Sequence, residues 1–303
     1  MDRLDAMGVF VEVVDSGSFS AAARKRRVPL TTVSRRIADL EAHLETRLLS
    51  RSTRRLELTE AGRAYLASAR HILELVGDAE RAAGGEYDTP RGELVVTTPM
   101  AFGRLQVLPV IADFLARFPD IRVRMVFSDR NLQLIDEHID VAVRIGRLPD
   151  SALVATRVGQ VHRVACASPG YLAGHGAPRT PDNLGEHIGV TFESLPAGPP
   201  WAFKAKAGGL AQATVQSRLR VNSAEAAVDA AIAGVGVTHL LSYQAAAAIR
   251  SGALTLLLRP FEPEGLPVHL VHDGQGALPV KTRRFLDFAV PQLRERLAGL
   301  LPD

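Results

Sequence analysis

A proline at position 29 interrupts a helical pattern, and this break constrains the fold of the first sixty residues more than any other feature. Before it, one helix is predicted up to Gly17, and Ser18 is placed to cap a second, short helix. The apolar residues whose helical spacing predicts the first helix are Leu4, Met7, Phe10, Val11 and Val14. Because proline resists a helix interior, a third helix must start after Pro29. Its apolar stripe, which is expected to face the core, is Val33, Ile37, Leu40 and Leu44.

The opposite face of this third helix carries short polar groups and arginine. A rotation of about 100° per residue places Thr31 and Arg35 opposite the apolar stripe, with Thr32 and Ser34 on its flanks. Arginine can hydrogen-bond guanine, and hydroxyl groups can meet bases or phosphates, so such a face suits the major groove of DNA. Two short helices joined by a tight turn, with this surface on the second, predict a helix-turn-helix. The alternative is a small helical bundle with a polar exterior.

An arginine-rich loop follows the third helix. Leu56 and Leu58 alternate with polar neighbours as in a strand, and the loop before them predicts a wing that lies along phosphates or in a minor groove. Residues 24–55 contain ten basic and three acidic side chains, a net charge of +7 in a chain that carries +3. This basic block is typical of phosphate neutralisation, although a solvated surface run has the same composition. The candidate DNA contacts are Ser18, Thr31, Thr32, Ser34, Arg35, Arg36, Arg51, Ser52, Thr53 and Arg54.

A long amphipathic helix is predicted from Glu60 to about Ala83, with Thr59 as its cap. A set of apolar residues on it recurs at heptad spacing, namely Tyr65, Ala69, Ile72, Val76, Ala79 and Ala83. Such a seam pairs two copies of a helix, but a single helix packed on its own domain gives a similar pattern. Residues 85–92 are rich in turn-forming residues and predict a hinge.

From Glu93 onward, short apolar runs alternate with helical patterns. Strands are predicted at residues 94–96, 123–127, 141–143, 164–167 and 268–272, and helices at residues 105–118, 131–137, 224–233 and 281–297. This alternation indicates an α/β fold with a mostly parallel sheet. In such folds a ligand binds beyond the carboxyl ends of the strands.

Polar residues near the ends of these predicted strands are candidate ligand contacts. Hydroxyl groups at helix N-termini can hold an anion or a carbonyl group, and Arg144 can supply charge. The same residues can equally cap helices and satisfy backbone groups without any ligand. The candidates are Thr98, Met100, Ser128, Arg144, Gly146, Phe192, Ser223 and Gly236. The expected ligand is a carboxylate or carbonyl compound.

Three motifs in register resemble the LysR-type transcriptional regulators: Phe19-Ser-Ala-Ala-Ala-Arg, residues 32–41 and residues 47–62. The resemblance spans the chain and implies a winged helix-turn-helix at residues 1–59, a dimerising linker helix at 60–84, and an effector-binding domain at 93–303. That domain is expected to have two lobes, like type II periplasmic binding proteins, with lobe I at 93–160 and 267–303 and lobe II at 161–266. Pro29 and Leu30 stand where the family often has serine and glutamine, so more of the recognition is expected from Thr31, Thr32, Ser34 and Arg35.

The resemblance implies operator DNA, a small-molecule effector and further copies of the chain as partners, in a dimer or tetramer, with RNA polymerase as another candidate. The sequence shows no membrane-length apolar run, no export signal and one cysteine, Cys166, so we expect a cytoplasmic protein. No catalytic motif, metal-ligand set or cofactor fingerprint is found. The rival hypothesis is an α/β small-molecule carrier or enzyme whose N-terminal helices serve assembly only.

Overall fold

The computed structural model describes residues 1–52, 55–83, 89–135, 137–192, 201–205, 208–274 and 278–300. The chain divides into two compact units, residues 1–92 and residues 93–303. Each unit encloses its own cluster of buried apolar side chains, as expected of separate domains. In the part of the chain that the structure describes, no helix is both long enough and apolar enough to cross a membrane.

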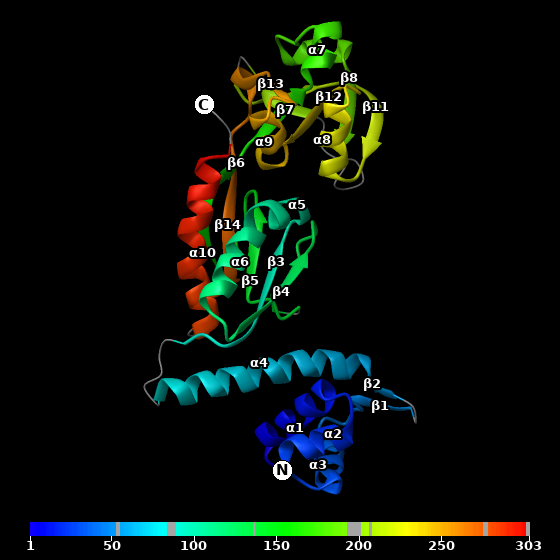
Figure 1. Ribbon diagram of the computed structural model, residues 1–303, viewed down its shortest axis with the longest axis vertical. Coiled ribbons are helices and arrows are strands. Elements are labelled where there is room, and N and C mark those ends of the chain that lie inside the picture. Colours follow the sequence, from blue (N-terminus) through cyan, green and yellow to red (C-terminus); the bar gives the residue numbers. More distant parts are fainter. Residues whose placement is uncertain are drawn as a thin grey trace. The chain divides into compact units, whose positions relative to one another are not determined.

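The N-terminal unit is a three-helix domain with a hairpin and a long helix (Figure 1). Its elements are α1 (Arg3–Asp15), α2 (Phe19–Arg26), α3 (Leu30–His43), β1 (Leu49–Ser52), β2 (Arg55–Leu58) and α4 (Glu60–Ala83). The predicted stripe of α3 is confirmed, because Val33, Ile37 and Leu40 are buried. The helix predicted before Gly17 is confirmed as α1, but its buried face differs in part from the apolar residues that predicted it. Besides Phe10, this helix buries Ala6, Val9 and Val13, and it leaves Leu4 41% exposed.

The hairpin is held between α3 and α4 by polar contacts to its backbone. Glu41 Oε1 accepts hydrogen bonds from the amides of Leu48 and Leu49 at 2.8 and 3.0 Å. Thr59 Oγ1 accepts one from the Gly62 amide at 2.9 Å, which confirms the predicted cap of α4. A Cβ on Gly62 would lie only 2.0 Å from the Leu48 carbonyl oxygen, so only glycine allows α4 to start this close to β1.

Packing of α4 on α1 uses the first part of the predicted heptad seam. The Tyr65 ring lies 5.7 Å from that of Phe10, and Ala69 is fully buried. These two positions therefore serve their own domain, which corrects their assignment to a dimer seam. Further along α4, Ile72 and Leu75 are 38% and 39% exposed. The side chain of Ala83, residue 84 and the first half of the predicted hinge (residues 85–88) lie outside the described residues.

Lobe I of the C-terminal unit is a five-stranded sheet in the order β4-β3-β5-β14-β6. The strands are β3 (Gly92–Thr98), β4 (Ile121–Phe127), β5 (Val141–Ile145), β6 (Leu153–Val161) and β14 (Leu266–Asp273). The helices α6 (Leu108–Arg117) and α10 (Val280–Ala298) cover one face of it (Figure 1). Between them, the rings of Phe114 and Phe285 meet edge to face at 5.3 Å. The segment from β3 to α6 contains α5 (Met100–Phe102) and a π-helical turn, η1 (Gly103–Val107).

Lobe II is a second five-stranded sheet in the order β11-β8-β12-β7-β13. Its strands are β7 (Arg163–Ala167), β8 (Ile188–Phe192), β11 (Gln216–Val221), β12 (Val237–Leu241) and β13 (Thr255–Leu257). Its helices are α7 (Pro169–His175), α8 (Ala224–Ile232) and α9 (Ser242–Arg250), with 3-10 turns η2 (Pro181–Glu186) and η3 (Arg259–Phe261). A separate hairpin of β9 (Trp201–Lys204) and β10 (Leu210–Ala213) packs on this lobe through Trp201 and Phe203.

The chain passes between the lobes twice, after β6 and before β14 (Figure 1). Both sheets are mixed, so the prediction of a mostly parallel sheet is wrong. In lobe I, β3 and β5 are parallel, but β14 runs antiparallel to both β5 and β6. The reason is topological, since β14 re-enters lobe I at the end by which β6 leaves it. The helix predicted at residues 131–137 is also absent from the described part of that segment, which forms turns.

His239 on β12 is buried between the hairpin residues Trp201 and Phe203, at ring distances of 5.3 and 5.1 Å. Its Nε2 has no hydrogen-bond partner in the described structure. Burial lowers the pKa of His239 to about 3, and the nearby charge of Arg163 adds to this effect. The native state therefore holds this imidazole neutral at every pH at which the protein is expected to work.

We predict that His239 makes the effector-binding domain less stable as the pH falls below about 6.5. The unfolded state binds a proton there and the native state does not, so at pH 5 the loss is about 2 kcal/mol. Urea unfolding at pH 7.5 and pH 5, followed by the fluorescence of Trp201, measures it. The His239→Phe variant should lose less stability over this interval than the wild type, while His71→Gln, on an exposed part of α4, should behave as the wild type. Equal pH dependence in wild type and His239→Phe would contradict the prediction.

Candidate nucleic-acid interface and effector site

The outward face of α3 combines hydroxyl groups with one exposed guanidinium group, that of Arg35, which makes only a weak ion pair. Thr31 and Ser34 are exposed and Thr32 is half-buried. The Arg35 side chain is 85% exposed, and its only ion pair in the described structure is a loose one with Asp39 at 4.0 Å. A surface ion pair of this kind contributes little, so Arg35 is available to another partner. The sequence placed these four residues on this face, and the structure brings them together there.

Arg36 differs from Arg35, because it is bound inside the domain. Its Nη1 contacts Asp5 Oδ2 at 2.5 Å, and Arg26 Nη2 donates a hydrogen bond to Asp5 Oδ1 at 2.8 Å. This network joins α1, α2 and α3. The structure therefore gives Arg36 an internal role, which the helical spacing used to select it could not reveal.

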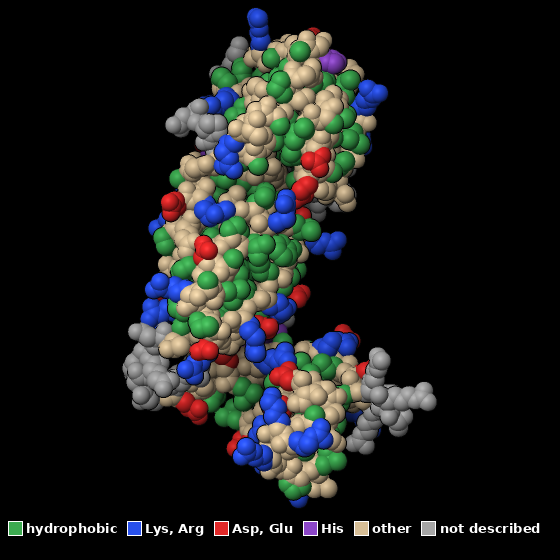
Figure 2. Space-filling view, in the orientation of Figure 1, with side chains coloured by type: hydrophobic (Ala, Val, Ile, Leu, Met, Phe, Trp, Pro, Cys, Tyr) green, Lys and Arg blue, Asp and Glu red, His purple; other side chains and the backbone are tan. Residues whose placement is uncertain are grey.

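The start of α3 lacks the usual side-chain cap. Pro29 occupies the N-cap position without a capping hydrogen bond, and Leu30, the first helical residue, is 46% exposed. Ser18 does cap α2, because its Oγ accepts a hydrogen bond from the Ala21 amide at 3.1 Å. Basic side chains are visible over this domain in Figure 2.

The wing is the hairpin of β1 and β2, in which Ser52 pairs with Arg55 in antiparallel register. This hairpin confirms the predicted strand at Leu56 and Leu58. Of the candidate contacts, Thr53 and Arg54 lie outside the described residues, and for Arg51 and Ser52 only the backbone is described. Because it is anchored to α3 by Glu41, the wing has a fixed starting point beside that helix.

Several predicted effector contacts gather where the two lobes meet. In lobe I, Thr98 ends β3 and is buried, its carbonyl accepts the Ser128 amide at 2.9 Å, and the Met100 amide donates to Asp129 Oδ1 at 3.1 Å. In lobe II, Ser223 Oγ accepts the Ala226 amide at 3.3 Å as the N-cap of α8. Phe192 is the last residue of β8. It pairs in register with Val221, which ends β11 two residues before Ser223.

Three further residues, which no sequence pattern predicted, connect these two edges. Arg104 of lobe I pairs with Glu225 of lobe II at 3.0 Å, and Tyr243 at the start of α9 packs edge to face on Phe102 at 5.1 Å. Burial raises the pKa of Tyr243, and the charges of Asp129 and Glu225 raise it further. No short motif marks such partners, since Arg104 and Glu225 are 121 positions apart.

The other predicted effector contacts have structural roles. Arg144 donates hydrogen bonds to Asn131 Oδ1 at 2.7 Å and to the Leu132 carbonyl at 2.5 Å, which fixes the segment that was predicted to be helical. Burial lowers the pKa of this guanidinium group. Gly146 adopts a φ of +109° and donates its amide to the Pro267 carbonyl at 2.8 Å.

Gly236 lies at the opposite edge of the lobe II sheet from Phe192 and Ser223. It precedes β12, which runs parallel to β8, whereas Phe192 and Ser223 lie near the carboxyl end of β8. A Cβ at Gly236 would lie 2.2 Å from the Ile188 carbonyl oxygen, so this glycine allows close approach of two strands. The structure thus gives Gly236 a role in strand packing, and its contact with an effector stays a prediction.

Comparison with known proteins places the whole chain among related sequences. A family model described as "Bacterial regulatory helix-turn-helix protein, lysR family" matches residues 4–63, and one described as "LysR substrate binding domain" matches residues 88–294. An HTH-type transcriptional repressor of Pseudomonas aeruginosa is 33% identical, over 97% of this chain and 93% of its own. The Escherichia coli transcriptional activator AaeR is 31% identical, over 93% and 91%. The structure of CrgA, a LysR-type regulator from Neisseria meningitidis, covers 95% of this chain and 98% of its own, with a TM-score of 0.62 and 32% identity.

Proposed function

This chain belongs to the LysR family of DNA-binding transcriptional regulators with an effector-binding domain, and we propose that it reads its operator with the outward face of α3. The observation that carries the proposal is the exposed group of Thr31, Ser34 and Arg35 beside an anchored wing. The N-terminal residues of a recognition helix contact base edges in the major groove. Leu30, at the first position, offers apolar atoms that suit a thymine methyl group.

We predict that Arg35→Ala weakens operator binding by about 1–3 kcal/mol if the guanidinium group contacts a base. The loss should be largest on the preferred sequence and small on unrelated DNA, because phosphate contacts carry no sequence information. Fluorescence anisotropy with labelled duplexes at fixed salt measures it. Arg283→Ala, at an exposed position on α10, is the matched control and should bind as the wild type. An Arg35→Ala variant that keeps full affinity and full sequence preference would contradict the role of this side chain.

The effector is proposed to bind between the lobes, near Thr98, Met100, Ser128, Phe192 and Ser223. Support comes from the polar groups that both lobes bring to this edge, together with the Arg104–Glu225 ion pair that joins them. A carboxylate or carbonyl compound suits these donors. A ligand that binds one arrangement of the two lobes more tightly would increase the fraction of molecules in that arrangement. Because its proposed partner is chromosomal DNA, we place the protein in the cytoplasm.

A homodimer, or a tetramer built from dimers, is proposed to form through the outer part of α4. Ile72 and Leu75 are large apolar side chains that α1 leaves exposed, one helical turn apart, and Val76 lies beside them half-buried. Two copies of such a face bury each other, and helix-turn-helix proteins read paired half-sites as dimers.

We predict that Ile72→Glu combined with Leu75→Glu shifts the protein towards monomer, since burying either carboxylate in an apolar helix pair is unfavourable. Analytical ultracentrifugation of the full-length chain measures the shift. The control is His71→Glu with Glu80→Gln, at exposed positions elsewhere on the helix, which should leave the oligomeric state unchanged. Dimers of undiminished stability in the Ile72→Glu, Leu75→Glu variant would rule out this surface as the interface.

A further inference from the structure

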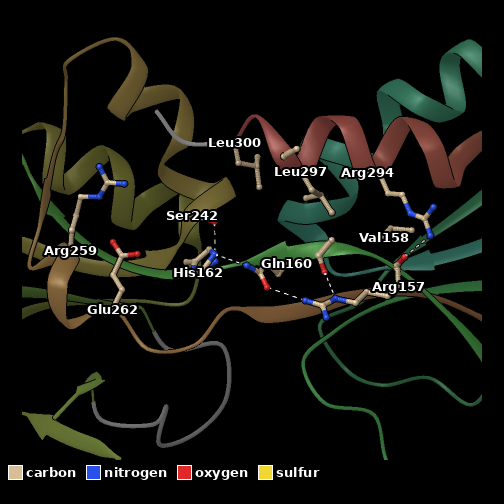
Figure 3. Close-up of a pocket in the computed structure, with 12 residues that line it drawn as sticks. Arg157, Val158, Gln160, His162, Ser242, Arg259, Glu262, Arg294, Leu297 and Leu300 are labelled. Carbon is tan, nitrogen blue, oxygen red and sulfur yellow. Dashed lines mark hydrogen bonds between the residues drawn. The ribbon is translucent and has the colours of Figure 1, made fainter. Parts of the chain in front are cut away.

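A cavity of about 760 Å³ lies where the two lobes of the effector-binding domain join (Figure 3). The floor of the cavity is β6, and one wall is the end of α10. The other wall is formed by the first residue of α9, Ser242, together with Arg259 of η3 and Glu262, which follows η3. None of the eight effector contacts predicted from the sequence lines it. It is therefore a separate feature from the inter-lobe site proposed above.

The polar groups of the floor already bond to one another. The His162 amide donates to Ser242 Oγ at 3.1 Å, and Gln160 Nε2 lies 3.4 Å from His162 Nε2. Arg157 Nη2 in turn donates to Gln160 Oε1 at 3.0 Å. Figure 3 shows these contacts as a row across the cavity floor. The floor alone therefore does not require a ligand.

The wall formed by η3 and Glu262 is different, because it combines an exposed guanidinium group, that of Arg259, with a carboxylate that lacks a donor. Glu262 Oε1 is buried and has no hydrogen-bond partner in the described structure. Burial raises the pKa of Glu262, while the charges of His162 and Arg259 oppose the shift. The Arg259 carbonyl accepts the Glu262 amide at 3.1 Å, while its side chain is exposed and has no hydrogen bond or ion pair with the residues that the structure describes. Because no described residue donates a hydrogen bond to either oxygen of this half-buried carboxylate, a ligand that supplies a donor to its accessible oxygen is favoured.

The opposite wall is apolar. Leu297 in the last turn of α10 and Leu300 just after this helix are 6% and 7% exposed, and Val158 on β6 is 1% exposed. In Figure 3 both leucines lie across the cavity from Arg259 and Glu262. The cavity thus offers a cation, a carboxylate that lacks a donor, and an apolar surface.

We propose that this cavity binds a small amino acid with an apolar side chain. Its carboxylate would contact Arg259, its ammonium group would donate to Glu262, and its side chain would lie against Leu297 and Leu300. A simple acid lacks the donor for Glu262, and a simple amine lacks the anion for Arg259. Because Arg259 and Glu262 belong to lobe II while α10 belongs to lobe I, the bound molecule contacts both lobes beside the strands that connect them. Binding there favours the arrangement of the lobes that fits the ligand.

The test is isothermal titration calorimetry of the full-length protein with three probes of one carbon skeleton: L-leucine, L-leucinamide and 4-methylpentanoate. We expect leucine to bind most tightly and each analogue to bind about tenfold more weakly, since each lacks one charge-assisted hydrogen bond. Glu262→Gln should weaken the binding of leucine but leave the binding of 4-methylpentanoate unchanged. Arg259→Ala should weaken the binding of both probes. Arg283→Ala, on α10 away from the cavity, should bind leucine as the wild type does.

The proposal is overturned if leucine shows no saturable binding at millimolar concentration, or if Arg259→Ala and Glu262→Gln bind it as the wild type does. Leucine binding that is lost in Ser223→Ala but kept in Arg259→Ala would move the ligand to the inter-lobe site and equally overturn it. The proposal does not depend on the DNA contacts. Operator affinity measured without leucine should be the same in Arg259→Ala and wild type, so a failure of DNA recognition is distinguishable from a failure of this site.

Discussion

In a variant that replaces Asp140 with alanine, we expect the effector-binding domain to lose about 3–5 kcal/mol of its free energy of unfolding. Asp140 Oδ1 lies 3.3 Å from Lys281 Nζ, and the two side chains are only 9% and 4% exposed. Asp140 Oδ2 also accepts the Val95 amide at 2.7 Å, and Lys281 donates to the Glu93 carbonyl. Removal of the carboxylate leaves a buried ammonium group without its counter-charge, which is far more costly than loss of a surface pair.

Urea unfolding followed by tryptophan fluorescence measures this loss, because Trp201 is the only tryptophan in the sequence and lies in the effector-binding domain. Asp113→Ala, an exposed position on α6 of the same domain, should change stability little. Combining Asp140→Asn with Lys281→Met should cost less than the sum of the two single changes, since the charges are removed together. If Asp140→Ala unfolds at the same urea concentration as Asp113→Ala, the pair does not hold α10 to β3 and β5.

We expect the second large effect, a loss of both stability and operator affinity, from Gly62→Ala. Alanine normally stabilises a helix by about 1 kcal/mol relative to glycine, so helix propensity alone predicts a gain. The new Cβ, however, would lie 2.0 Å from the backbone oxygen of Leu48, which no rotation of a side chain can relieve. Overpacking of this kind costs about 1–3 kcal/mol and moves the start of α4 away from β1. The wing then shifts relative to α3, and we expect operator binding to fall by at least tenfold, about 1.4 kcal/mol.

Operator titration and thermal unfolding of Gly62→Ala, compared with Ala61→Ser, test this expectation. Ala61 is the exposed neighbour on the same helical turn, and a small change there should leave both measurements near the wild type. A Gly62→Ala protein that is more stable and binds operator normally would mean that the contact between α4 and the hairpin does not set the geometry of the wing.

The sequence was most informative where a single local rule decides the structure. The spacing of Val33, Ile37 and Leu40 defined the buried face of α3, and Thr59 marked the start of α4. These features depend on helical periodicity and capping within a few residues, which a sequence displays directly. For the same reason the exposed positions of Thr31, Ser34 and Arg35 could be predicted.

Errors arose where a distant partner decides the outcome. The segment at 131–137 has a helical pattern, but Arg144 binds the carbonyl of Leu132 and the side chain of Asn131 and holds the described part in turns. Arg36 was predicted as a DNA contact beside Arg35, yet Asp5 of α1 engages its side chain, and a contact of Arg36 with DNA stays a prediction. The direction of β14 depends on how the chain returns from lobe II, which periodicity does not encode. Tyr65 and Ala69 fit a heptad seam and a domain core equally well, and only the packing on Phe10 separates the two.

If the outward face of α3 selects the DNA sequence, this selection is measured most directly by sequencing the genomic fragments that the purified full-length protein retains. The wild type should enrich one motif. The triple variant Thr31→Ala, Ser34→Ala and Arg35→Ala should retain DNA with little or no preference for that motif, while its Trp201 fluorescence and unfolding stay unchanged. Enrichment of the same motif by the triple variant, or no enriched motif for the wild type, would contradict the account.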